Sequence, residues 1–176
     1  EHGGLKELHG LPIFQIGIGK TNAASNLTEI LWNEEPDVVI NFGSCGNLKD
    51  FKVGEVIEVG TTYNNIDVRP FAEYGCTPEN NECEIKLSNS GVKCFSTDQI
   101  YDNSRTDYAN KYLEMINTCD IVDMECYPLA YVCKQRDIMF KSFKWVSDDG
   151  DIHKWEQNAA IGFENFSNKL INLLKK

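Results

Sequence analysis

The sequence predicts an α/β protein, organised as a three-layer α/β/α sandwich with a mostly parallel, mixed central sheet. Short apolar runs typical of buried strands alternate along the chain with longer stretches of helical periodicity. Several of these runs end in small or acidic residues, as parallel strands do at a binding crevice. Since the chain has 176 residues, of which 41% are hydrophobic, we expect residues 1–176 to form one domain with its own core.

The expected elements follow one another in β and α alternation. Residues 11–17 are predicted to form a strand, and a helix is predicted from Thr21 to near Pro36. The later predicted strands cover residues 38–42, 55–63, 92–97, 121–124 and 138–146. The later predicted helices cover residues 104–116, 125–135 and 155–174. The polar, turn-rich stretch 64–91 is expected to be a long excursion with a functional role.

Charge and cysteine content restrict the function classes. The formal net charge of −10 speaks against a nucleic-acid or anionic-membrane surface, because both need clustered Lys and Arg. The seven cysteines form no C-x-x-C pair, and several lie in apolar runs, which predicts reduced, buried thiols in a cytoplasmic protein. Neither a metal nor a dissociable cofactor is expected, since no Cys or His spacing fits zinc and residues 17–20 lack a dinucleotide or P-loop fingerprint.

Three polar clusters stand at the carboxyl ends of predicted strands. They are residues 43–46, residues 123–125 and residues 147–149. In an open α/β sheet such ends converge on one crevice, so the clusters are expected to meet there. The alternative for Glu125 and Asp148 is that each caps the helix that follows it, because acidic side chains are favoured at helix N-termini. Either residue alone fits both interpretations, but three clusters together favour a site.

An ordered set of motifs carries a resemblance to a known family. The chain is similar to nucleoside phosphorylases and nucleosidases, and most similar to the 5′-methylthioadenosine/S-adenosylhomocysteine nucleosidases. The motifs are residues 42–48, residues 53–56, residues 122–125 with 130–133, and residues 146–148. The resemblance implies the family's fold and the cleavage of the bond between a purine base and ribose.

The resemblance also implies roles for individual residues. Asp148 matches the general acid that protonates the departing purine, with Ser147 orienting it, and Asp149 or Asp151 could raise its pKa. Glu125 matches the carboxylate that accepts hydrogen bonds from the ribose hydroxyls. The other implied substrate contacts are Asp123, Met124 against the sugar, and Ser44, Cys45 and Gly46 around the attacking oxygen. The alternative for Met124 is an ordinary core methionine.

The base side of the site departs from the family pattern. Residues 96–101 resemble a G-D-x-F segment, but Ile100 stands where a stacking Phe is usual. Tyr101 or Trp155 could compensate, although both residue types also serve as ordinary packing residues. Phe71 lies in a stretch, 67–75, that resembles a loop reaching across a dimer interface toward the neighbour's pocket. A homodimer is therefore implied.

Two nucleophiles are considered for the implied reaction. A phosphate site needs a fork of Arg side chains, yet Asn41 stands where hexameric phosphorylases carry Arg, and the chain has arginines only at 69, 105 and 136. We therefore expect hydrolysis of a purine nucleoside such as 5′-methylthioadenosine or S-adenosylhomocysteine. Phosphorolysis is the alternative, because residues 43–46 resemble the phosphorylase version of this motif.

One departure concerns the water-activating group. Relatives carry a further strand and helix ahead of this segment, and that strand supplies a carboxylate general base. No such element precedes Leu11, where Glu1, Glu7, His2 and His9 lie in a polar, Gly-rich stretch. The given chain is then either a fragment of a longer product or a shortened variant. A catalytically silent nucleoside binder and an unrelated α/β protein are the further alternatives.

Overall fold

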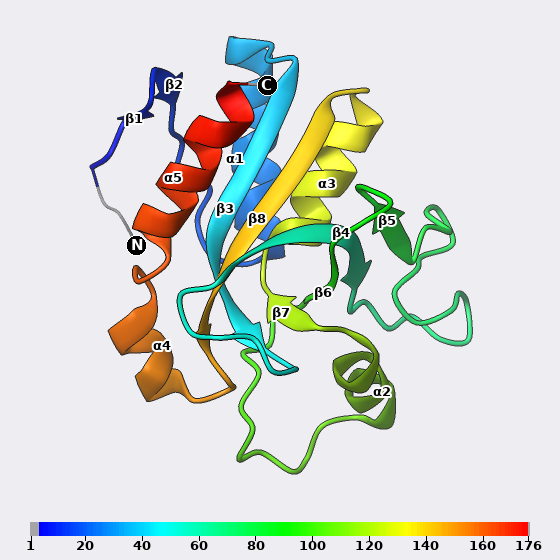
Figure 1. The fold of residues 1–176 in the computed structure, drawn as a ribbon. Coiled ribbons are helices and arrows are strands. Elements are labelled where there is room, and N and C mark those ends of the chain that lie inside the picture. Colours follow the sequence, from blue (N-terminus) through cyan, green and yellow to red (C-terminus); the bar gives the residue numbers. More distant parts are fainter. Residues whose placement is uncertain (1–3, 176) are drawn as a thin grey trace.

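The computed structural model of the chain describes residues 4–175 and places a six-stranded sheet at the centre (Figure 1). Its strands lie in the order β5-β4-β6-β7-β3-β8. Since β4 also pairs with β8, the sheet closes on itself. The longest ladder, from Val38 to Gly46 of β3 along β8, is parallel, as are β4–β6 and β6–β7, whereas β3–β7, β4–β5 and β4–β8 are antiparallel. The expected mixed, mostly parallel sheet is confirmed. The strands are β3 (Val38–Asn47), β4 (Val56–Asn64), β5 (Glu84–Lys86), β6 (Val92–Ser96), β7 (Ile121–Asp123) and β8 (Met139–Asp148).

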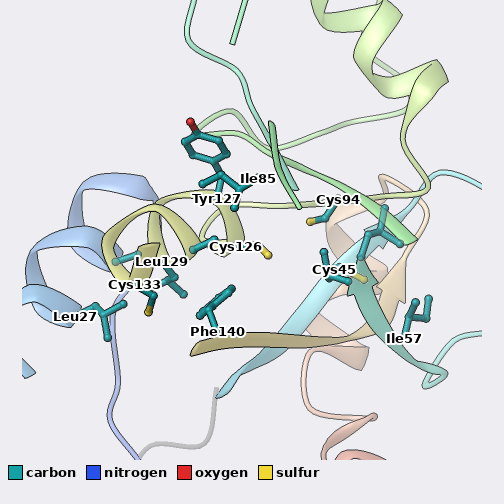
Figure 2. Close-up of a cluster of buried hydrophobic side chains, with 14 of the residues drawn as sticks. Leu27, Cys45, Ile57, Ile85, Cys94, Cys126, Tyr127, Leu129, Cys133 and Phe140 are labelled. Carbon is teal, nitrogen blue, oxygen red and sulfur yellow. The ribbon is translucent and has the colours of Figure 1, made fainter. Parts of the chain in front are cut away.

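Helices cover both faces of the β3–β8 part of the sheet (Figure 1). The two faces alternate along β8, where Phe140 and Val146 join the core under α1 and α3, while Phe143 and Trp145 join the core under α5. Figure 2 shows the first of these cores, with Leu27 of α1 and Leu129 of α3 near Phe140. The helices are α1 (Lys20–Glu34), α2 (Asn110–Thr118), α3 (Cys126–Gln135), α4 (Ile152–Asn158) and α5 (Phe163–Leu174).

Helical spacing explains why α1 and α5 pack as they do. Ala23, Leu27 and Leu31 recur every four residues of α1 and are buried in the core that α1 shares with α3 and the sheet. Phe166 and Leu170 of α5 repeat the same spacing on the opposite face. The amphipathic periodicity thus decides which side of each helix faces the core. None of the helices in the described part of the chain is long and apolar enough to cross a membrane.

The strand expected over residues 11–17 is wrong. Only β2 (Leu11–Pro12) is extended in a ladder, and it pairs with β1 (Glu7–Leu8) in a short hairpin outside the central sheet. Leu11 packs against the core under α5, while Ile16 packs against the core under α1 and α3. The segment therefore passes from one face of the sheet to the other, which a strand aligned with the sheet does not do.

The terminal helix predicted over residues 155–174 is divided into α4 and α5. The cause is Trp145 of β8, whose indole Nε1 donates a hydrogen bond of 2.8 Å to the carbonyl of Ala159. A Cβ atom at Gly162 would lie 2.1 Å from Cγ of Trp145, so the backbone here is in contact with the indole. The tryptophan occupies the space in which a continuous helix would run.

The helix predicted over residues 104–116 begins later, at Asn110. Ser104 donates through its amide and its hydroxyl to Asp102, and the Tyr108 hydroxyl accepts from the Asp102 amide. These local side-chain bonds compete with helical ones and hold the preceding segment in turns.

The prediction that the cysteines are reduced needs a partial correction. Five of them are free and buried, as expected, namely Cys45, Cys94, Cys119, Cys126 and Cys133. Cys76 and Cys83 form a disulfide in the long excursion, because the chain folds back and brings their Cα atoms within 4.6 Å. The sequence offered no sign of that approach, since the pairing depends on the path of the loop.

Substituting Gly162 with Ala should destabilise the fold. The added Cβ would overlap the base of the Trp145 side chain, which has no free space into which to move because it is fully buried. We expect the free energy of unfolding to fall by about 1–3 kcal/mol in urea denaturation, as for other overpacked cores. Ala160→Val in the same turn is the control, because Ala160 is exposed. Equal stability of the two variants would contradict this account of the helix break.

Candidate active site

One pocket collects nearly all of the residues that the sequence singled out. The predicted residues that line it are Ser44, Cys45 and Gly46 of β3, Asp123, Met124 and Glu125 at the end of β7, Asp148 at the end of β8, and Ile100, Tyr101 and Trp155. Ser147 lies behind the pocket wall and is fully buried. Phe71 is not brought to the pocket, since it is 82% exposed in the turn that closes at the Val68 carbonyl.

The three polar clusters meet although the strands are not all parallel. β7 runs antiparallel to β3, and the two pair only at Gly46 with Val122 and at Asn47 with Ile121. Because the overlap is so short, the carboxyl end of β7 still lies beside the last residues of β3. Residues 43–46 are themselves part of β3, which therefore continues beyond the strand predicted over residues 38–42. A Cβ at Gly46 would lie 2.8 Å from Val122 Cγ1, so a residue without a side chain is needed where the strands cross.

Asp148 is a buried carboxyl at the pocket wall. The β3–β8 register shifts between Cys45 and Gly46, which pair with Val146 and Asp148, so Ser147 is an extra residue in a bulge of the kind that redirects side chains near active sites. The Ser147 hydroxyl donates to Asp148 Oδ2 at 2.6 Å. The Gly150 amide donates to Oδ1 at 2.9 Å.

Burial raises the pKa of the Asp148 carboxyl above its ordinary value. The hydrogen bonds from Ser147 and Gly150 act in the opposite direction, and the charges of Asp149 and Asp151 reinforce the rise. The net shift is upward, so Asp148 keeps its proton to a higher pH than an exposed aspartate does. A carboxyl in this state can deliver a proton to a ligand in the pocket.

The capping interpretation of Glu125 and Asp148 is wrong. Glu125 occupies the N-cap position of α3 but makes no side-chain capping bond, and Asp123 Oδ2 instead accepts from the Cys126 amide at 2.8 Å. At α4 the capping residue is Asp151, whose carboxylate accepts from the amides of His153 and Lys154. Both acidic residues are therefore left to face the pocket.

Glu125 is held at the pocket by contacts from two directions. Its Oε1 accepts a 3.0 Å hydrogen bond from the amide of Gly19, which precedes α1, and its Oε2 lies 3.8 Å from the ammonium nitrogen of Lys144. Its side chain is 18% exposed, so part of the carboxylate faces the pocket. A carboxylate fixed in this way accepts hydrogen bonds from hydroxyl groups of a ligand.

Lys144 and Asp123 form an ion pair in the protein interior. Lys144 Nζ lies 2.8 Å from Asp123 Oδ2, and the two side chains are 2% and 0% exposed. Although burial alone would lower the pKa of Lys144, the charges of Asp123 and Glu125 raise it. Burial alone would raise the pKa of Asp123, but Lys144 and hydrogen bonds, including one from Ser96, lower it. Each charge therefore favours the ionised form of the other, and the Asp123 carboxylate contacts Lys144 although Asp123 also lines the pocket.

The buried groups Cys94, Asp123 and Cys126 have the arrangement of a possible metal site, with ligand atoms within 4.8 Å of one another. The Lys144 ammonium already supplies positive charge at Asp123, and the Cys94 thiol donates to Asp123 Oδ1 at 3.3 Å. Burial raises the pKa of the Cys94 thiol well above its ordinary value, which disfavours the thiolate that a metal would need. The expectation of no metal stays a prediction.

The remaining wall of the pocket is mostly apolar and aromatic, and Thr97 and Gln99 are its polar members. Ile100 is 57% exposed at the rim, and Tyr101 stacks on Tyr108 with ring centroids 6.1 Å apart. Trp155 of α4 donates from Nε1 to the Ser44 hydroxyl at 3.3 Å, which links this wall to β3. Such a surface is suited to a flat, partly apolar ring system.

Several contributors escaped the sequence analysis. They are Ile18 and Ile152 in the pocket lining, and Lys144 beneath it. Thr97, Gln99 and Val122 also line the pocket, and they lie in the segments 96–101 and 122–125, which carry the resemblance. Lys144 carried a usable signal, because a charged residue within the apolar run 138–146 requires a buried counter-charge. Among the N-terminal candidates, Glu7 is exposed in β1 and His9 bonds to Ser167, so neither lies at the pocket. Glu1 and His2 lie outside the described residues.

Comparison with known proteins identifies the family. A family model described as the phosphorylase superfamily matches residues 7–75 and 79–176. The chain belongs to the phosphorylase superfamily. A 5′-methylthioadenosine/S-adenosylhomocysteine nucleosidase of Haemophilus influenzae is 32% identical to this chain over 176 aligned positions. The alignment covers 89% of this chain and 73% of the relative.

Solved structures agree with the fold. A 5′-methylthioadenosine/S-adenosylhomocysteine nucleosidase of Neisseria meningitidis, in complex with methylthio-immucillin-A, is similar with a TM-score of 0.78 and 23% identity, covering 96% of this chain and 83% of the other. A futalosine hydrolase of Helicobacter pylori is similar with a TM-score of 0.81 and 18% identity, covering 95% and 81%. At these identities the likeness establishes that this phosphorylase-superfamily chain shares their fold.

Removing the buried ammonium should destabilise this phosphorylase-superfamily fold strongly. Lys144→Met leaves the fully buried Asp123 carboxylate without its counter-charge, and we expect a loss of about 3–5 kcal/mol in the free energy of unfolding. Urea denaturation measures the loss, with Lys141→Met, a half-buried position of the same strand, as control. The double variant Asp123→Asn with Lys144→Met should recover much of the stability. A single variant as stable as wild type would contradict the ion pair.

Proposed function

We propose that the protein hydrolyses the N-glycosidic bond of a purine nucleoside such as 5′-methylthioadenosine or S-adenosylhomocysteine and releases the free base. The observation that carries the proposal is that two carboxyl groups in different environments share one pocket. Asp148 has a raised pKa, and Glu125 is fixed by Gly19 and Lys144. The relative from Haemophilus influenzae that bears this nucleosidase name supports the substrate class.

The two environments suit two different steps. As the bond from the sugar to the base breaks, the base gains negative charge, and protonation by Asp148 would make it a better leaving group. The sugar gains positive charge, and Glu125 would hold its hydroxyl groups next to a carboxylate that favours that charge. Met124, which also lines the pocket, would offer an apolar surface to the ring. Enzymes commonly divide work between two carboxyl groups by setting their pKa values apart.

Water is the nucleophile that the charges of the site favour. None of the three arginines lines the pocket, because Arg69 pairs with Asp67, Arg105 pairs with Asp107, and Arg136 lies over the Trp32 ring. Lys144 is engaged with Asp123 and Glu125. A phosphate dianion would therefore enter a pocket whose charged lining residues are acidic and whose buried cation is already paired. Phosphorolysis is the second candidate only because residues 43–46 resemble the phosphorylase motif.

The test is to incubate the purified protein with methylthioadenosine, adenosine or inosine, each with and without phosphate, and to separate the products by chromatography. Hydrolysis predicts free base and free sugar at equal rates in both conditions. If base appeared only with phosphate, and together with a sugar phosphate, the protein would be a phosphorylase. Nucleoside binding in calorimetry without turnover would make it a silent binder.

Replacing the proposed acid should nearly abolish turnover. Asp148→Asn keeps the size of the side chain but removes the transferable proton, so we expect kcat to fall by about 10²–10⁴-fold while nucleoside binding stays within a few fold. Initial rates and calorimetry provide the two readouts. Glu156→Gln, an exposed position on α4, is the control for loss of a nearby negative charge. An Asp148→Asn variant that retained a tenth or more of the turnover would exclude the assignment.

The pH dependence follows from the direction of the Asp148 shift. The acid form is the active one, so kcat/KM should fall as pH rises through the pKa of Asp148, and burial moves that fall above the range of an exposed aspartate. The measurement is kcat/KM against pH for wild type and for the residual activity of Asp148→Asn. The alkaline fall should disappear in the variant. Its persistence would assign the fall to another group.

We also propose a homodimer, on the strength of the exposed Phe71 ring in a loop that resembles an interface loop of the family. A large apolar side chain with 82% exposure favours burial against a partner. The Cys76–Cys83 disulfide argues against the cytoplasmic location expected from the sequence, because reducing compartments seldom retain such a pair.

A further inference from the structure

A single turn joins Asp148 to the wall on the base side of the pocket. The Gly150 amide donates to Asp148 Oδ1 at 2.9 Å, while the Gly150 carbonyl accepts from the Asn103 amide at 3.1 Å. The Asn103 side chain adds a second bond, because its Nδ2 donates to the Asp149 carbonyl at 2.9 Å. The turn is thus fastened to the carboxyl on one side and to the segment after Tyr101 on the other.

The contact between turn and wall requires glycine at position 150. Gly150 has a φ of +91°, a backbone conformation that residues with a side chain rarely adopt. A Cβ atom there would lie 2.8 Å from Cε1 of Tyr101 and 2.9 Å from the amide nitrogen of Asn103. Gly150 is buried, and Tyr101 lines the pocket itself. The position of the carboxyl is therefore coupled to the position of the aromatic wall.

We propose that Asn103 is a positioning residue for Asp148. Asn103 fastens the turn at Asp149 and Gly150 to the wall that would contact the base. The inference rests on the proposed glycosidase function, in which Asp148 delivers a proton to that base. Asn103 is exposed and is not among the residues that line the pocket, so it acts through the turn and not on the substrate. Proton transfer depends on sub-ångström placement, and a displacement of about 1 Å can lower a rate by about 10²-fold.

A merely structural role would have a different signature. Asn103 lies on the surface and outside the three buried cores, so its truncation should leave the thermal midpoint nearly unchanged. A positioning role predicts instead that kcat falls while KM changes little, because ribose binding through Glu125 is untouched. The experiment compares Asn103→Ala with Thr106→Ala, an exposed residue of the same segment. We expect kcat to fall by about 10–100-fold in Asn103→Ala and to stay within twofold in Thr106→Ala.

Asn103→Asp isolates the side-chain donor. The aspartate has nearly the same shape and keeps the backbone amide, but it presents an oxygen to the Asp149 carbonyl and so repels it. We expect its kcat to be as low as that of Asn103→Ala or lower. Asn103→Gln retains a donor and should recover part of the rate. If all three substitutions gave the same kcat as wild type, the proposal would be overturned.

The pH profile gives an independent readout. The groups that face Asp148 electrostatically are Cys45, Asp149, Asp151 and Lys154, and none of them is substituted in Asn103→Ala. A loosened turn changes both the burial of the carboxyl and its hydrogen bond from Gly150, so the alkaline fall of kcat/KM should move to a different pH. An unchanged profile together with an unchanged kcat would contradict a positioning role.

Amide hydrogen exchange separates this inference from the proposed function. The Gly150 amide is bonded to Asp148 and buried, so it should exchange slowly in wild type and clearly faster in Asn103→Ala, while α3 amides exchange equally in both. Failure of wild type to release base from any nucleoside would remove the proposed function without touching this result. Equal exchange at Gly150 in both proteins would overturn the turn-fastening role of Asn103 even in an active enzyme.

Discussion

A buried ammonium group between two carboxylates is the constraint on which the site depends. An unpaired charge in the interior costs several kcal/mol, so Lys144 of β8 must lie where Asp123 of β7 can reach it. Asp123 also accepts from Ser96 of β6 and from the first amide of α3. The Asp123 carboxylate therefore joins three strands and a helix. Because Glu125 follows only two residues later, its position at the pocket is fixed as well.

The same ion pair separates the chemistry of the two pocket carboxyls. Glu125 lies within 3.8 Å of a cation, which favours its charged form and its use as a hydrogen-bond acceptor. Asp148 has acidic neighbours in Asp149 and Asp151, and burial raises its pKa. A pocket whose two carboxyls lie in such different environments is suited to a reaction that needs an acceptor at one end and an acid at the other. The distribution of charge around the strand ends decides which carboxyl has which task.

Sequence patterns predicted the elements whose formation is local. The buried positions of α1 recur at helical spacing and β8 is an apolar run, so these two elements were found close to their observed bounds. The start of β3 was also found, but the strand continues to Asn47, beyond its predicted end at Phe42. The errors come from long-range contacts. The break before α5 depends on Trp145 meeting Gly162, and the Cys76–Cys83 bond depends on the path of a loop. The antiparallel direction of β7 depends on how the sheet closes. No window along the chain contains such information.

The clusters at the predicted strand ends line one pocket, whereas the task of each acidic residue there is not contained in the sequence pattern. Capping shows the difference. Acidic residues do cap α3 and α4, but they are Asp123 and Asp151, placed two residues before Glu125 and three after Asp148. The sequence alone allows any of these carboxylates to be the cap. The choice is made by side-chain partners, since Glu125 is drawn to Gly19 and Lys144, and Asp148 to Ser147 and Gly150. A carboxylate whose own helix is already capped by a neighbour is the one left available for chemistry.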